Sequence, residues 1–290
     1  MRNEKEMLEL ILTKAEEMDT IRLVEMNGSR VSSTAKKDPF QDYDIVYYVE
    51  DIDSFLKDHS WVDYFGERIL LQMPDQMVIP PANSRRKSFS YLMLFTDGNR
   101  IDLTLTPVNL AEKSLKSNEA RKILLDKDNR TTALVVSTED PYRISNPNEK
   151  EFIDCSNEFW WVSTYIAKAL WREELPLAKN IMEGTVREML MTMLNWHIGI
   201  RTDFKVSAGK DGKNIQKYVE SSVWNKLVRT YPDGNYKNIW QSLFNMCDLF
   251  EELSIEISQT FDFDLPDYGK NVLPYLEHIE KLPQYSKDLY

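Results

Sequence analysis

The spacing of hydrophobic residues along the first part of the chain predicts a mixture of helix and strand. Residues 2–19 carry apolar side chains at steps of three and four, with acids and lysines between them, which is typical of an amphipathic helix. Residues 21–26 and 42–49 are short apolar runs, the second rich in β-branched and aromatic side chains, and they predict strands. Residues 53–71 favour a helix followed by a further strand.

A β-hairpin is predicted over residues 88–106. Two strand-like runs, 88–96 and 100–106, flank Asp97-Gly98, a dipeptide that favours the tight turn between antiparallel strands. The first ~110 residues therefore predict an α/β mixture with at least two adjacent antiparallel strands.

The pattern becomes helical beyond a loop-like segment at residues 140–147. The predicted helices cover residues 149–174, 176–200, 214–230, 235–260 and 270–282. We therefore expect an α+β protein of two domains. Residues 1–146 would form a mixed sheet with flanking helices, and residues 147–290 a helical bundle.

Length and composition exclude several classes of protein. A chain of 290 residues is long enough for two domains, and 36 basic against 47 acidic residues argue against a nucleic-acid partner. Cys155 and Cys247 are too few for a disulfide framework or a cysteine zinc site, and they fit a reducing compartment. The chain has no apolar run of about 20 residues and no apolar leader, so we expect a cytoplasmic protein without a membrane partner.

Asp42 and Asp44 are the first candidates for chemistry. They are two residues apart in a predicted strand, so their side chains share one face and repel each other. A bound cation would relieve the repulsion, and a pair of Mg²⁺ ions is the obvious candidate, because this cation prefers hard oxygen ligands. The alternative is that both carboxylates lie exposed at the entrance of a strand.

Asp102 is a possible third member of this group. Residues 100–106 alternate strictly, so Asp102 takes the polar face of its strand and its apolar neighbours Ile101 and Leu103 take the other. A carboxylate on a second strand could converge with Asp42 and Asp44. Alternatively, it is a solvent-facing residue of a half-buried sheet.

Gly28-Ser29 follows the first predicted strand. Glycine allows the backbone to approach a phosphate closely, and the serine hydroxyl and nearby amides can donate to its oxygens. The GxGxxG and GxxxxGK[ST] motifs of Rossmann and P-loop proteins are absent, and such a turn is common by itself. Its significance comes from its spacing to the three aspartates.

Together these motifs resemble the nucleotidyltransferase signature of the polymerase β superfamily. The run from Asn27 to Arg30 and the run from Asp38 to Val46 are similar to the aminoglycoside 6-adenylyltransferases, which modify streptomycin. Residues 169–179 and 196–213 also resemble that family, so the likeness covers nearly the whole chain.

The resemblance implies transfer of AMP from ATP to a hydroxyl of a cationic aminoglycoside, with ATP as co-substrate and Mg²⁺ as cofactor. It makes residues 1–146 the nucleotidyltransferase domain and residues 147–290 the substrate-binding domain. By the family pattern, Asp42 and Asp44 hold the metal. Asp102 is the general base on the attacking hydroxyl, a third metal ligand, or both.

The same resemblance places further residues on the nucleotide. Gly28 and Ser29 would contact the β- and γ-phosphates, and Arg30 would add charge there or be a surface arginine. In the loop 208–213, Lys213 matches the family position better than Lys210 and would meet the triphosphate. The alternative for this loop is a solvated surface segment.

A drug with guanidinium and amine groups needs carboxylates and flat aromatic faces. Glu183 and Trp171 are the candidates, with Glu158 and Trp160 as further possibilities. Each has a structural alternative, since Glu183 could only pair with Arg187 on a helix surface and Trp171 could be a core residue.

Two other hypotheses stay open at this point. One keeps nucleotide transfer but changes the acceptor to another small molecule, a protein hydroxyl or an RNA end, of which the acidic balance of the chain favours RNA least. The other is a nucleotide-binding module without turnover, against which the intact carboxylates at all three positions argue.

Overall fold

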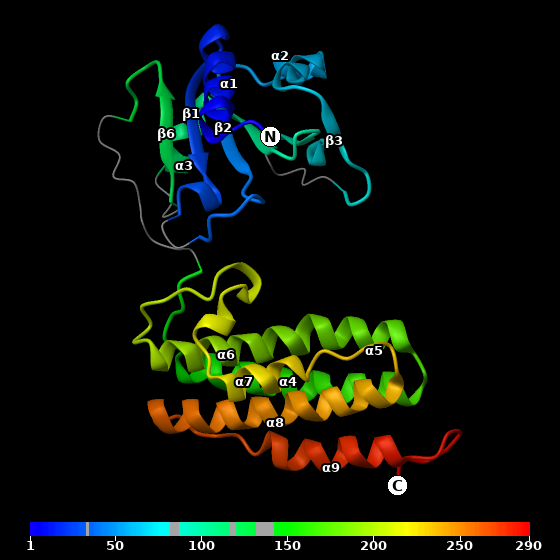
Figure 1. Cartoon of the computed structure of the whole chain (residues 1–290). Helices are drawn as coiled ribbons and strands as arrows, with labels where there is room; N and C mark the ends of the chain where they lie inside the picture. The colour runs from blue at the N-terminus through cyan, green and yellow to red at the C-terminus, as the bar shows by residue number, and fades with distance from the viewer. Residues whose placement is uncertain (33–34, 82–86, 116–119, 132–141) are drawn as a thin grey trace. The chain divides into compact units, whose positions relative to one another are not determined.

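The computed structural model describes residues 1–32, 35–81, 87–115, 120–131 and 142–290. The chain divides into two compact units, Met1–Pro141 and Tyr142–Tyr290 (Figure 1). The first contains a mixed sheet with helices and the second is helical, so the α+β expectation is confirmed. The boundary between the units lies a few residues before the expected one at residue 146.

The described part of the first unit contains a six-stranded sheet in the order β3-β4-β5-β2-β1-β6. Neighbouring strands are antiparallel except β2 and β5, which run parallel. The predicted hairpin is confirmed, because β4 and β5 pair around the turn at Asp97-Gly98. The strands are β1 (Ile21–Asn27), β2 (Tyr43–Val49), β3 (Arg68–Gln72), β4 (Phe89–Phe95), β5 (Arg100–Pro107) and β6 (Lys122–Asp126).

Helix α1 (Glu4–Glu17) covers part of one face of this sheet. It begins at Asn3, whose side chain accepts from the Glu6 amide while the Glu6 carboxylate accepts from the Asn3 amide, a reciprocal cap. Its buried residues, Met7, Ile11 and Ala15, join the apolar side chains of the strands in one core. The helix expected over residues 2–19 is therefore confirmed, although the observed helix is two residues shorter at each end.

The helix expected after residue 53 is mostly wrong. Only α2 (Asp53–Leu56) is α-helical, and residues His59–Phe65 form 3₁₀ turns before the predicted strand appears as β3. Asp58 accepts from the Ser60 amide and so caps these turns. This local hydrogen bond starts a new turn at Asp58. It competes with the backbone hydrogen bonds, four residues apart, that a continuous α-helix would need there.

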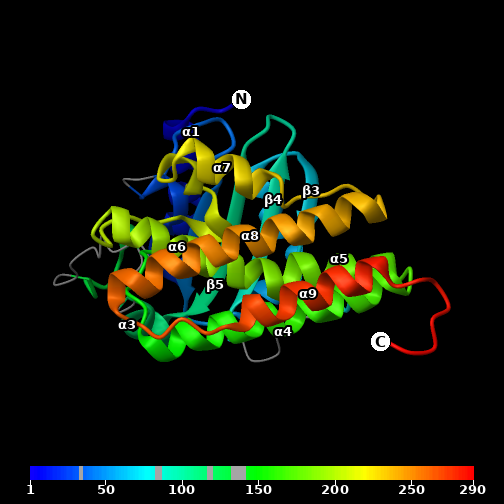
Figure 2. The same ribbon diagram turned by 90° about the horizontal axis from the view of Figure 1, so that it is seen from below.

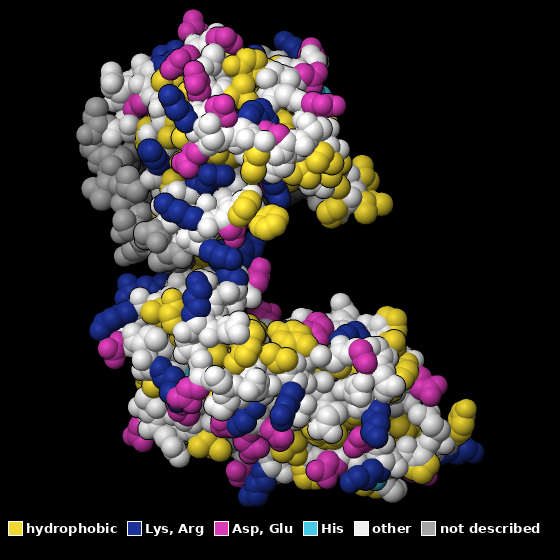
Figure 3. Space-filling model, in the orientation of Figure 1, with side chains coloured by type: hydrophobic (Ala, Val, Ile, Leu, Met, Phe, Trp, Pro, Cys, Tyr) yellow, Lys and Arg dark blue, Asp and Glu magenta, His cyan; other side chains and the backbone are white. Residues whose placement is uncertain are grey.

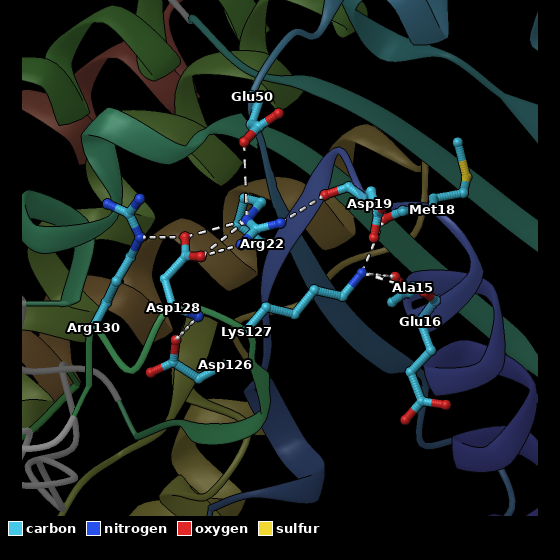
Figure 4. A network of polar contacts seen from close by, with 10 residues as sticks. All are labelled: Ala15, Glu16, Met18, Asp19, Arg22, Glu50, Asp126, Lys127, Asp128 and Arg130. Atoms are coloured by element: carbon cyan, nitrogen blue, oxygen red, sulfur yellow. Dashed lines mark hydrogen bonds and ion pairs between the residues drawn. The ribbon is translucent and has the colours of Figure 1, made fainter.

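Strand β6 was not predicted, and two contacts beyond its end fix that end of the sheet (Figure 4). The Lys127 ammonium donates to the Ala15 and Met18 carbonyls, at 2.9 and 3.1 Å, at the C-terminal end of α1, where a cation is favoured. Arg22 of β1 pairs with Asp128. The sequence signal is weak because β6 has five residues with none fully buried.

The second unit is a bundle in which α8 lies alongside α6 and α9 lies alongside α4 (Figures 1 and 2). One continuous core of apolar side chains joins these helices. Its α-helices are α4 (Glu149–Trp171), α5 (Leu175–Ile181), α6 (Arg187–Arg201), α7 (Ser221–Val228), α8 (Tyr236–Phe261) and α9 (Tyr268–Lys281).

Two helices of this unit differ from the expectation. The segment 176–200 is interrupted by a π-helical turn, Met182–Val186, where Gly184 has non-helical dihedrals and lets the chain bulge. The helix expected over 214–230 is shortened to α7, because residues 210–217 form 3₁₀ turns. The helices expected over 149–174, 235–260 and 270–282 are confirmed as α4, α8 and α9.

Charged side chains of both signs are interspersed on the visible face of each unit (Figure 3). Within the described ranges, every helix is too short or too polar to cross a membrane.

Candidate active site

The parallel pairing of β2 and β5 places two of the predicted aspartates side by side. Asp44 of β2 and Asp102 of β5 are direct partners in the register. The flanking residues Tyr43, Ile101 and Leu103 are fully buried on the opposite face, so the polar alternation predicted for residues 100–106 is present. Both carboxylates therefore share the same face of two adjacent strands.

Asp42 joins them from the residue before β2 begins. One carboxylate oxygen from each of Asp42, Asp44 and Asp102 lies within 4.8 Å of the other two, and we call these residues the carboxylate cluster. All three side chains are half-buried. Three hard oxygen donors at this separation fit a divalent cation such as Mg²⁺, which binds through carboxylates and waters.

The electrostatics of Asp44 favour a cation at this place. Burial, together with the negative charges of Asp42 and Asp102, raises the pKa of Asp44 to about 7. A carboxyl group in such a position keeps its negative charge at neutral pH at a cost in free energy, and a bound cation removes that cost. The electrostatics of Asp44 and the three carboxylate oxygens therefore both favour a bound cation at this place.

Gly28 belongs to the turn that faces Asp44. This turn, Gly28–Arg30, is a single 3₁₀ turn after β1, and we call it the glycine–serine turn. Gly28 has φ +72°, and a Cβ atom built on it would lie 1.8 Å from Asp44 Oδ2. Only glycine combines this dihedral with such a close approach, so the motif and the cluster form one site.

Ser29 and Arg30 connect this turn to the start of β2. The Arg30 guanidinium donates to the carbonyls of Gln41 and Asp42, at 2.8 and 2.9 Å. The Gln41 amide donates to the Ser29 carbonyl at 3.0 Å. The Arg30 side chain is 13% exposed, so most of it is withdrawn from solvent.

Arg100 is a site residue that the sequence reasoning missed. Its guanidinium binds both oxygens of Asp102, from Nε to Oδ1 and from Nη2 to Oδ2, each at 2.6 Å. The signal was present, because Arg100 precedes Asp102 by two residues and so takes the same face of a strand. A forked arginine neutralises the third carboxylate in this structure.

The other predicted residues lie in the helical unit. Lys213 is exposed after the 3₁₀ turn Lys210–Gly212. Glu183 lies in the π-helical turn and pairs with Lys179 and Arg187, at 3.5 and 3.1 Å, which is the pairing that the sequence alternative foresaw for Arg187.

Trp171 is partly buried at the end of α4. Its indole N–H donates to the Leu282 carbonyl at 3.0 Å, and its ring packs against the core of the helical unit. The roles of Lys213, Glu183 and Trp171 toward substrates stay predictions.

Comparison with known proteins assigns the chain to the adenylyltransferases, a class of enzymes. The profile of the streptomycin adenylyltransferase family matches residues 1–279, and the chain belongs to this family. The resemblance inferred from the glycine–serine turn and the aspartates is thereby confirmed.

Curated relatives match over nearly their full length. The chain is 40% identical over 276 residues to an aminoglycoside 6-adenylyltransferase of Campylobacter jejuni, covering 95% of each chain. It is 39% identical over 280 residues to that of Bacillus subtilis strain 168, covering 96% of this chain and 98% of the relative. A crystal structure of an aminoglycoside 6-adenyltransferase from Bacillus subtilis is 36% identical, with 97% of this chain and 100% of that chain covered and a TM-score of 0.48.

Proposed function

We propose that this enzyme transfers AMP from ATP to a hydroxyl of an aminoglycoside, with streptomycin as the preferred acceptor and Mg²⁺ as the cofactor. Pyrophosphate leaves, and the modified drug no longer acts, which gives resistance. The observation that carries the proposal is the carboxylate cluster at the start of β2 and on β5, combined with membership of the streptomycin adenylyltransferase family.

Asp42, Asp44 and Asp102 would hold the metal. Their oxygen donors suit Mg²⁺, and the raised pKa of Asp44 indicates a place where positive charge is favoured. When bound, the metal supplies Lewis acidity at the phosphate oxygens and neutralises charge there.

The chain's own groups would then carry out the remaining work. An Asp102 oxygen would accept the proton of the attacking hydroxyl, as a general base. Both of its oxygens accept from Arg100 in the structure, so Arg100 would have to shift or share its contact. At the glycine–serine turn, the Gly28 and Ser29 amides and the Ser29 hydroxyl would donate to the β- and γ-phosphates.

Groups of the helical unit would complete the substrate contacts. Lys213 would add positive charge at the triphosphate. Glu183 would meet an amine or guanidinium of the aminoglycoside, and Trp171 would offer an aromatic face. The support for Glu183 is its partly exposed carboxylate, and a cationic ligand would compete there with Lys179 and Arg187.

The test is to mix the purified protein with ATP, Mg²⁺ and a panel of aminoglycosides and to follow the release of pyrophosphate. The proposal expects release that depends on streptomycin, together with a product that carries one AMP. Release with a different aminoglycoside only would overturn the choice of acceptor. Release that needs no aminoglycoside, or none at all, would overturn the proposed reaction.

A further inference from the structure

We propose that Arg30 and Gln41 are positioning residues that fasten the glycine–serine turn to the start of β2 and thereby fix the carboxylate cluster. The inference rests on the proposed function, since it assigns these two residues to the same metal site. It differs from both sequence expectations for Arg30, which were added charge at the phosphates of ATP or a surface arginine.

The hydrogen bonds of Arg30 go to the main chain, and its Nη1 atom also lies 3.8 Å from the exposed Glu4 carboxylate. Nε donates to the Asp42 carbonyl at 2.9 Å and Nη2 to the Gln41 carbonyl at 2.8 Å. The guanidinium lies 3.7 Å from the centre of the Tyr43 ring, a side chain that is itself fully buried. A planar fork on two carbonyls, stacked on an aromatic ring, is a geometry that lysine cannot reproduce.

Gln41 makes the return connection. Its side-chain amide donates to the Ser29 carbonyl at 3.0 Å and approaches the Ser29 hydroxyl at 3.4 Å. Arg30 of the turn therefore binds the main chain just before β2, and Gln41, which precedes β2, binds the main chain of the turn. Two segments twelve residues apart in the chain are joined by reciprocal hydrogen bonds.

Asp42 depends most on this connection. Strand β2 begins at Tyr43, whose partner in β5 is Ile101, so Asp42 lies outside the paired register. The Asp42 main chain is instead held by Arg30 through its carbonyl. Small displacements of a ligand matter at such sites, because groups that orient a metal ligand typically change metal affinity or activity about 10- to 100-fold when removed.

The experiment measures binding of Mn²⁺ alone, as a spectroscopic probe for Mg²⁺, to the full chain without ATP. Arg30→Lys should weaken Mn²⁺ binding by about 10- to 100-fold and Gln41→Ala by about tenfold. Because both residues fasten the same two segments, the double variant should lose less than the product of the two single effects.

Arg68→Lys is the matched control. Arg68 also donates to a main-chain carbonyl, that of Val62 at 2.8 Å, but it lies on the edge strand β3. This variant should bind Mn²⁺ as the wild type does. Thermal unfolding of every variant separates lost metal affinity from lost folding, and Gln41→Ala keeps the test decisive if Arg30→Lys fails to fold.

A phosphate-contacting Arg30 gives a different result. Arg30→Lys would then bind Mn²⁺ like the wild type and lose affinity only for ATP, which overturns the inference. Unchanged Mn²⁺ binding by Gln41→Ala, or strictly multiplicative effects in the double variant, would also overturn it. If the wild type binds Mn²⁺ but transfers no AMP, the proposed function fails while the positioning result is still read from Mn²⁺ affinity.

Discussion

Gly28 and Asp44 approach each other so closely that no side chain fits between them. A Cβ atom on Gly28 would lie 1.8 Å from Asp44 Oδ2 and 2.6 Å from its Cγ. The pairing of Asn27 with Asp44 in adjacent strands brings the glycine to this position. The glycine–serine turn and the carboxylate cluster are therefore one unit, and a change in the turn must displace a carboxylate.

Gly28→Ala should abolish AMP transfer and weaken metal binding, because the methyl group can only be accommodated by moving Asp44. Gly98→Ala is the control. Gly98 has a similar positive φ, +84°, but a Cβ atom there would meet nothing within 4 Å. Both variants should lose about 1–2 kcal/mol of unfolding free energy from the left-handed backbone.

Steady-state kinetics and denaturant unfolding of both alanine variants separate the loss of activity caused by moving Asp44 from the loss of stability caused by the left-handed backbone. Gly98→Ala should keep its activity at temperatures where it is folded. An active Gly28→Ala enzyme would show that Asp44 can move without loss and would contradict the close-approach argument.

The raised pKa of Asp44 makes metal-free stability fall with increasing pH. The carboxyl group has an ordinary pKa of 3.8 when unfolded and about 7 when folded, so between these values the folded state binds more protons. Stability from this group is complete below about pH 4 and is lost as the pH rises through 7. At pH 8 in EDTA, Asp44→Asn should therefore be more stable than the wild type.

Urea unfolding of both proteins between pH 4 and 8 checks the sign. The advantage of the asparagine variant should vanish near pH 4, and adding Mg²⁺ should stabilise the wild type only. Glu9→Gln, which removes an exposed charge from α1, is the control and should show no such pH trend. A wild type that gains stability relative to Asp44→Asn as the pH rises would contradict the assigned electrostatics.

Glu183→Gln tests the proposed contact with the cationic drug. The KM for the aminoglycoside should rise about 3- to 30-fold, while the KM for ATP stays unchanged. A rise of this size corresponds to the free energy of one partly exposed charge-assisted hydrogen bond. Glu188→Gln, an exposed acid five residues further along, is the control for net charge. An equal KM change in both variants, or none in Glu183→Gln, would remove Glu183 from the substrate site.

The sequence predicted elements with strong periodicity and missed those that depend on tertiary pairing. Helices α1, α4, α8 and α9 carry long apolar stripes, and the β4–β5 hairpin has a distinct turn dipeptide, so local pattern sufficed. Strand β6 is short and is held by pairing with β1. The break between α5 and α6 depends on one glycine in a π-helical turn, which periodicity does not reveal.

The candidate site was partly predictable for the same reason. The polar alternation around Asp102 indicated which face it takes, and family resemblance joined it to Asp42 and Asp44. The parallel register that makes Asp44 and Asp102 direct partners is a long-range property, since about fifty residues separate the two strands. The contacts of Arg30 with the Gln41 and Asp42 carbonyls depend on how the turn after β1 meets the segment before β2, which spacing alone does not reveal. The Arg100–Asp102 contact, in contrast, follows the i, i+2 spacing within β5.

The most direct measurement of the central claim is the mass of the aminoglycoside after incubation with ATP and Mg²⁺, with wild type and Asp102→Asn compared in parallel. The account predicts one added AMP on streptomycin with the wild type. It predicts at least about 100-fold slower addition with Asp102→Asn, although that variant still binds ATP. Modification at the wild-type rate by Asp102→Asn, or by the wild type in excess EDTA, would contradict a metal-dependent carboxylate cluster.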